Sequence, residues 1–226
     1  MNKSMIFAEE YRLIDLSEKV EPGKVFGPLD DKRRYEIRPF DFPPGETMHE
    51  IDMESHISTH VEAPSHFMMA RFGKKAKDVS ELPLNSFIGE AVLIDLSQSK
   101  PRQVFMPEKM KEEGVRKRDI VLVGNSPHRG SNRPWLAAET AKWFAELPIK
   151  MIGFDRTVGV EPPQEPKTLE KYYMHEYMLS NDIPMIEVLA NLDKLRKKRF
   201  FFIGIPAKMG GLDSFPIRAV AFEPID

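Results

Sequence analysis

The eleven residues from His56 to His66, HISTHVEAPSH, have the composition of a metal-binding segment. They include three of the six histidines of the chain, and the ligands of one ion are often clustered in this way. A neutral imidazole nitrogen offers a lone pair, and a neighbouring carboxylate compensates the charge of a divalent ion. His56, His60 and Glu62 provide this set. We therefore predict a divalent metal site, with His66 as a fourth group on the open side of the ion.

Polar and apolar residues alternate from Glu50 to Glu62, and the first two histidines fall on the same side as Glu62. This period of two predicts a β-strand, because on a helix Glu62 would point away from both histidines by about half a turn. A straight strand would separate the two histidine α-carbons by about 13 Å, near the limit for sharing one ion. We therefore expect a bend near Ser58 and Thr59. Pro64 should end the strand, and the following turn could bring the third histidine back to the ion.

Several predicted elements surround this segment. Apolar runs rich in Val, Ile and Phe predict buried strands at Ala91–Leu96, Asp119–Val123, Met151–Phe154, Arg199–Ile205 and Arg218–Phe222. Amphipathic spacing predicts a helix over Pro134–Leu147, capped by Asn132, and a shorter one over Pro107–Glu113. Interleaved strands and helices indicate an α/β fold with some parallel pairing. The stretch from Glu21 to Pro44 holds five prolines and predicts loops with one short strand at most.

Composition excludes several classes of protein. A chain of 226 residues, 41% of them hydrophobic, suits one domain spanning residues 1–226. Its net charge of -2 argues against nucleic acid as a partner. The start of the sequence lacks the apolar core of a signal peptide, and no run approaches the roughly 18 to 20 apolar residues of a membrane span. We expect a cytoplasmic protein without a membrane partner. The absence of cysteine leaves nitrogen and oxygen as the only strong metal ligands.

The histidine segment resembles the H-x-G-T-H-x-D-x-P-x-H signature of kynurenine formamidase and the wider cyclase family of metal-dependent hydrolases. Five of the seven fixed positions match, namely His56, Thr59, His60, Pro64 and His66. Ser58 replaces the glycine and Glu62 replaces the aspartate. His175 and Glu187, which lie twelve residues apart in HEYMLSNDIPMIEVLANL, look like the two remote metal ligands of the family. IDLS (residues 14–17) and LDSFPIRAVAF (residues 212–222) are similar to its opening and closing segments.

The resemblance implies a role for each matching residue. His56, His60 and Glu62 would hold a first metal, and His175 would hold a second. Glu62 and Glu187 would serve both ions, and His66 would be the proton donor and acceptor. Because glutamate is one methylene longer than aspartate, the second ion could be weak or absent, so one or two ions are expected. The implied fold is a swivelling β/β/α arrangement with mixed sheets and flanking helices, usually found as homodimers or homotetramers.

A metal site with an open position and a neighbouring histidine predicts hydrolysis of a small-molecule amide. A divalent ion with an open position lowers the pKa of its bound water toward about 7, and the resulting hydroxide attacks a carbonyl carbon. His66 would carry the proton to the leaving nitrogen of an N-formyl group or a cyclic amide. Histidine and carboxylate suit zinc and manganese alike, and zinc is preferred.

Two alternatives stay open. One is a non-hydrolytic cyclase or dehydratase in which the metal stabilises an enolate. The other is a metal-binding protein without catalysis, a hypothesis that the departures at Ser58 and Glu62 encourage. The presence of both His175 and Glu187 favours an enzyme over such a protein, because a vestigial site need not keep both residues.

Overall fold

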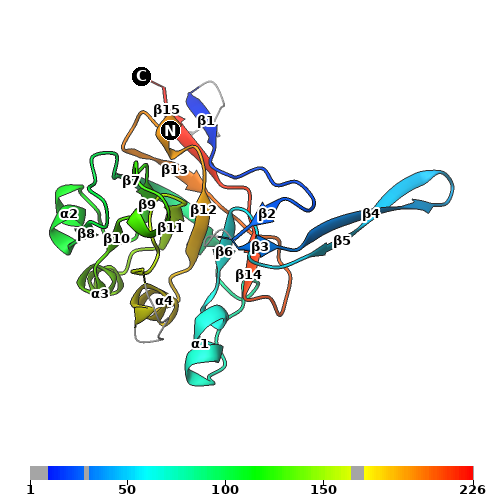
Figure 1. The fold of residues 1–226 in the computed structure, drawn as a ribbon, viewed down its shortest axis with the longest axis horizontal. Coiled ribbons are helices and arrows are strands. Elements are labelled where there is room, and N and C mark those ends of the chain that lie inside the picture. The colour runs from blue at the N-terminus through cyan, green and yellow to red at the C-terminus, as the bar shows by residue number, and fades with distance from the viewer. Residues whose placement is uncertain (1–9, 28–30, 164–170, 226) are drawn as a thin grey trace, which may run out of the picture.

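The structure is a computed structural model that describes residues 10–27, 31–163 and 171–225. A nine-stranded sheet runs through it in the order β1-β15-β13-β7-β9-β11-β12-β6-β14 (Figure 1). Four central strands are parallel: β7 (Ile88–Asp95), β9 (Ile120–Gly124), β11 (Met151–Asp155) and β12 (Met185–Leu189). The flanking strands pair antiparallel: β1 (Tyr11–Asp15), β15 (Val220–Pro224), β13 (Arg199–Ile203), β6 (His60–Glu62) and β14 (Ser214–Pro216).

The central strands are buried on both faces, and each face has its own core. Along β7, Val92 and Ile94 join the core that packs against the helices, whereas Ala91 and Leu93 join the core on the opposite face. The helical layer consists of α2 (Pro107–Glu112), α3 (Ala138–Glu146) and α4 (Tyr173–Leu179). The sheet curls to enclose the second core, as the bridge from residue 17, beyond β1, to residue 189 of β12 shows. Strands covered on both sides are continuously apolar, which is why the sequence reveals them.

The predicted α/β fold with a mixed sheet and flanking helices is confirmed. The five predicted strands are present as β7, β9, β11, β13 and β15, and the short predicted helix is α2. Within residues 10–27, 31–163 and 171–225, no helix combines the length and apolar character needed to cross a membrane.

The predicted helix over Pro134–Leu147 begins later than expected, because α3 starts at Ala138. The preceding residues form β10 (Trp135–Leu136), which pairs in parallel with β8 (Val104–Phe105). Asn132, predicted as the helix cap, instead ends a separate 3-10 turn. The residues that the amphipathic pattern assigned to the first helical turn therefore pair with β8 instead, because tertiary contacts override helix propensity.

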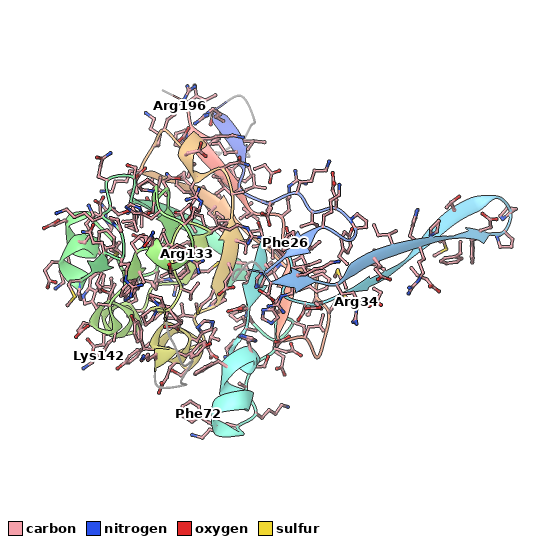
Figure 2. All side chains as sticks on the ribbon, viewed as in Figure 1. Phe26, Arg34, Phe72, Arg133, Lys142 and Arg196 are labelled. Atoms are coloured by element: carbon pink, nitrogen blue, oxygen red, sulfur yellow. The ribbon has the colours of Figure 1, made fainter. Side chains whose placement is uncertain are left out.

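The stretch from Glu21 to Pro44 is more ordered than predicted. It contains β2 (Val25–Phe26), β3 (Lys32–Arg33) and β4 (Tyr35–Phe42). β4 pairs along its whole length with β5 (Glu46–Met53), and this hairpin, residues 35–53, forms an arm that projects from the body (Figures 1 and 2). Every residue from 38 to 51 is exposed. Because most of β4 buries no face, its sequence need not alternate regularly, so the prolines dominated the prediction for this stretch.

The predicted bend between the histidines is present. β5 ends at residue 53 and β6 begins at residue 60, so His56 lies in the connection rather than on the long strand that the alternation predicted. Ser58 has a left-handed φ of 56° and donates through Oγ to the Glu18 carbonyl at 2.7 Å. Thr59 Oγ1 donates to the Val188 carbonyl at 2.6 Å. These contacts turn the chain into β6, and α1 (Pro64–Phe72) follows directly.

Ser58 provides a test of the bend. Ser58→Gly should change the free energy of unfolding by less than about 1 kcal/mol, because relief of the left-handed conformation offsets one lost hydrogen bond. Ser58→Val should lower it by more than about 2 kcal/mol, since a β-branched side chain adds strain and the hydrogen bond is still lost. Urea unfolding measures both. Equal losses in the two variants would show that the backbone conformation at this position has no energetic consequence.

Candidate metal centre

The fold gathers the six predicted site residues in one place. His60 and Glu62 lie two residues apart on β6 and therefore share a face of the strand. β12 runs alongside and pairs Glu187 with His60. The bend before β6 supplies His56, the first turn of α1 supplies His66, and α4 supplies His175. Segments from distant parts of the chain thus converge on the short strand β6.

Glu62 is at the centre of this cluster and is only 2% exposed. Its Oε1 lies 3.1 Å from His56 Nδ1, 3.6 Å from His60 Nε2 and 3.7 Å from His66 Nε2. Its Oε2 lies 3.5 Å from His175 Nε2. The two oxygens thus face different histidines, so the longer side chain of glutamate still reaches both halves of the cluster.

The spacing of these atoms suits ligands of a metal ion. Glu187 lies 3.9 Å from His60 Nε2 through one oxygen and 4.0 Å from His175 Nε2 through the other. Ligands of a tetrahedral ion at zinc bond lengths are separated by about 3.4 Å, which is longer than an ordinary hydrogen bond. Two groups of three have ligand atoms that all lie within 4.8 Å of one another: His56, Glu62 and His66, and His60, Glu62 and Glu187.

His56 lies close to two other histidines. Its ring centroid is 5.0 Å from that of His60, with which it was expected to share an ion, and 4.3 Å from that of His66. His66, the expected proton carrier, is therefore also close enough to Glu62 to be a ligand.

Two buried atoms fit a bound cation. His60 Nε2 and Glu62 Oε2 are inaccessible to solvent, and neither has a hydrogen-bond partner among the described residues. Leaving a buried polar atom without a partner costs roughly 1 to 3 kcal/mol. A divalent ion would satisfy both atoms, so the residues present fit a metal.

The histidines that face Glu62 are each held in one orientation. His60 Nδ1 donates to the Ser58 carbonyl at 2.8 Å, and His175 Nδ1 is 2.8 Å from Glu161 Oε1. A hydrogen bond at one ring nitrogen fixes which nitrogen keeps its lone pair, and metal-binding histidines are usually held in this way. The Nε2 atoms of both rings are thus directed toward the carboxylates at the centre.

Asp213 holds the rings of the other two histidines, His56 and His66, in one orientation. Its Oδ2 is 2.9 Å from His56 Nε2 and 2.9 Å from His66 Nδ1. Sequence reasoning missed both Asp213 and Glu161 as parts of the site. Asp213 lies in the segment that resembles the closing part of the family, but nothing in its spacing marks it as a histidine partner. Glu161 carries no signal in the sequence at all.

The electrostatics of the cluster favour positive charge. Burial lowers the pKa of His56, but hydrogen bonds to Asp213 and Glu62 outweigh burial and raise it to about 10. His175 behaves similarly, since two carboxylates overcome its burial and raise its pKa. Burial alone would raise the pKa of Glu62, yet the surrounding histidines bring it well below the usual range. The pKa of Glu187 is raised by burial and by the charge of Glu62.

The cluster opens into a pocket of about 550 Å³. Its apolar wall includes Phe154, Val158, Val160, Pro162 and Tyr172. The side chain of His66 is 30% exposed and that of His60 is fully buried, so a small molecule in the pocket can reach the first and not the second. The arrangement thus combines a cation site, a reachable imidazole and an apolar wall.

Comparison with curated proteins finds relatives named kynurenine formamidase. Kynurenine formamidase from Erythrobacter litoralis is 28% identical over 219 residues, which cover 94% of each chain. Kynurenine formamidase from Bordetella avium is 29% identical over 181 residues, covering 77% of this chain and 79% of the relative.

Solved structures show the same fold. Isatin hydrolase A from Labrenzia aggregata superimposes with a TM-score of 0.76 at 23% identity, over 95% of this chain and 94% of that one. A predicted metal-dependent hydrolase from Bacillus stearothermophilus superimposes with a TM-score of 0.72 at 22% identity. The match covers 94% of this chain and 98% of that one.

The family model described as "Putative cyclase" matches residues 14–162, which is more than half of the chain. The match includes the histidine segment from His56 to His66. The family predicted from the sequence is thereby confirmed, and the chain belongs to this cyclase family.

Proposed function

We propose that the protein is a metal-dependent hydrolase that cleaves a carbon–nitrogen bond of a small amide, an N-formyl group or a cyclic amide. The observation that carries this proposal is the buried Glu62, faced by ring nitrogens of four histidines whose other nitrogens are all hydrogen-bonded. The relatives named kynurenine formamidase support an amide as the substrate. The solved isatin hydrolases show that the same fold is used by hydrolases.

Five residues would hold the metal: His56, His60, Glu62, His175 and Glu187. A bound divalent ion supplies a Lewis acid for the carbonyl oxygen and makes water acidic enough to ionise near neutral pH. Zinc is our first choice and manganese the second, because nitrogen and oxygen ligands suit both. Glu62 faces His56 and His60 through one oxygen and His175 through the other, which supports a centre for two ions.

His66 is the residue that moves protons in this proposal. Its Nδ1 is held by Asp213, and its Nε2 is directed toward the centre of the cluster. Nε2 would accept a proton as the carbonyl is attacked and return it to the leaving nitrogen. The exposure of His66 in the pocket supports this role, because the proton carrier must reach the substrate.

The apolar wall of the pocket favours a small substrate with an apolar part beside the polar cluster. We propose a small molecule rather than a nucleic acid or a membrane as the partner. A cytoplasmic location stays a prediction. The alternatives of a non-hydrolytic cyclase and of a non-catalytic metal-binding protein have less support, since the curated relatives carry the name of a hydrolase.

Metal content tests the centre directly. The purified protein should contain up to two equivalents of zinc or manganese per chain. His60→Ala should reduce that content, because His60 Nε2 is buried without a hydrogen-bond partner in the described part of the chain. Elemental analysis measures both. His49→Ala is the matched control, because His49 is exposed on the arm and should not affect the metal. Unchanged metal content in the His60 variant would refute the proposed centre.

The role of His66 can be separated from that of a ligand. If it moves protons, His66→Ala should keep the metal content and lower kcat for amide hydrolysis by about 10² to 10⁴-fold, with a small change in KM. Assays on N-formyl and cyclic amides, combined with elemental analysis, measure this. Loss of one metal equivalent in the variant would instead make His66 a ligand. Absence of any amide turnover in the metal-loaded wild type would remove the proposed function itself.

We also propose that the protein is a homodimer or homotetramer in which a second copy covers the arm. Phe40, Phe42, Met48 and Ile51 are all exposed on it, and a lone two-stranded ribbon is at best marginally stable in water. The arm carries five carboxylates and one arginine, whereas the exposed Lys74 and Lys75 follow α1. This charge complementarity supports a contact between the arm of one copy and the α1 end of another.

The double substitution Phe40→Ser and Phe42→Ser should shift the protein toward the monomer, because it removes apolar surface that the second copy would bury. Light scattering of the eluted protein measures the mass. Leu84→Ser is the control, since Leu84 is 62% exposed and lies outside the arm. A wild-type monomer, or equal effects of both changes, would contradict the proposed contact.

A further inference from the structure

Asp213 is not among the predicted metal ligands, yet it contacts two residues of the cluster. Its Oδ2 lies 2.9 Å from a ring nitrogen of His56 and 2.9 Å from a ring nitrogen of His66. Its other oxygen accepts a hydrogen bond from Ser55 Oγ at 3.2 Å, and its backbone carbonyl accepts the Ala63 amide at 2.8 Å. The carboxylate is thus fixed from the side chain and from the main chain.

We propose that Asp213 is a positioning residue that sets the tautomers of His56 and His66 together. A carboxylate only accepts hydrogen bonds, so each ring nitrogen that faces it must carry the hydrogen. In the neutral rings that a metal ion requires, the lone pairs are then on His56 Nδ1 and His66 Nε2. Both of these atoms face the same atom, Glu62 Oε1, at 3.1 and 3.7 Å.

His56 and His66 depend on one and the same acceptor, Asp213 Oδ2, whereas the other two histidines do not. His60 and His175 each have an acceptor of their own, the Ser58 carbonyl and Glu161. Removal of Asp213 should therefore disturb the group of His56, Glu62 and His66 and spare the group of His60, Glu62 and Glu187. A general loss of packing would not be selective in this way.

The catalytic consequence rests on the proposed function of His66. As Nε2 accepts and returns the proton, Nδ1 keeps its hydrogen bond to Asp213, so the ring need not rotate between the two steps. A ring without this partner would populate the other tautomer, in which Nε2 already carries a hydrogen and cannot accept one. Asp213 acts through the histidine and does not touch the substrate in this account.

Asp213→Ala tests the proposal. Alanine removes the one oxygen that both rings share, so neither His56 nor His66 keeps its acceptor. In zinc-loaded protein, ¹⁵N spectra of the histidine rings should show changed protonation of His56 and His66, with the signals of His60 and His175 unchanged. Titration with zinc should show a loss of about 10 to 100-fold in affinity for one equivalent only. The value of kcat should fall more than KM changes.

Asp182→Ala is the matched control, because it makes the same chemical change in an exposed pair with Lys77. Wild-type ring signals and zinc affinity in the Asp213 variant would overturn the proposal. Changes in all four ring signals, together with a lower midpoint of unfolding, would also overturn it in favour of a general structural role. If only the His56 and His66 signals and one zinc affinity changed, but the wild-type protein hydrolysed no amide, the positioning role would stand and the proposed function would fall. Failure of the proposal and failure of the proposed function are therefore distinguishable.

Discussion

Burying a carboxylate away from water is expensive unless positive charge and hydrogen-bond donors replace its hydration. Glu62 imposes this requirement here, since it is 2% exposed at the centre of the protein. Its neighbours are mainly imidazoles, which can supply protons or leave lone pairs for a cation. Glu62 is on β6, which lies between β12 and β14. Each neighbouring strand supplies part of the shell around Glu62, with Glu187 on β12 and Asp213 just before β14.

Local strain accompanies this arrangement. Val188, which follows Glu187, has a left-handed φ of 63° that β-branched residues rarely adopt. At the same point the register between β11 and β12 shifts, as at a β-bulge. The Val188 carbonyl accepts the hydroxyl hydrogen of Thr59, so the bulge on β12 and the bend before β6 hold each other. Strain of this kind is concentrated at functional sites, where surrounding contacts maintain it.

The sequence revealed those parts of the protein whose physical cause is local. Three histidines and a carboxylate within eleven residues indicated a metal site, and a straight strand was too long for them, which indicated the bend at Ser58. His175 and Glu187 were found only through the resemblance to a family, because distant ligands have no spacing that periodicity can detect. Asp213 and Glu161 stayed hidden since a hydrogen-bond acceptor leaves no pattern in the chain. The start of α3 and the arm were missed because pairing between strands overrode the local pattern.

The pairing of β6 with β14 also has a consequence for how the protein is made. His56 and Asp213 are separated by 157 residues in sequence. While the ribosome is still synthesising the intervening chain, the nascent protein already contains HISTHVEAPSH but lacks the acceptor that orients two of its rings. Contacts of such long range form late in folding, because the entropy of closing a large loop must be overcome first. An unfinished chain therefore holds the histidines without the arrangement that orients them, and it would bind a divalent ion more weakly than the finished centre.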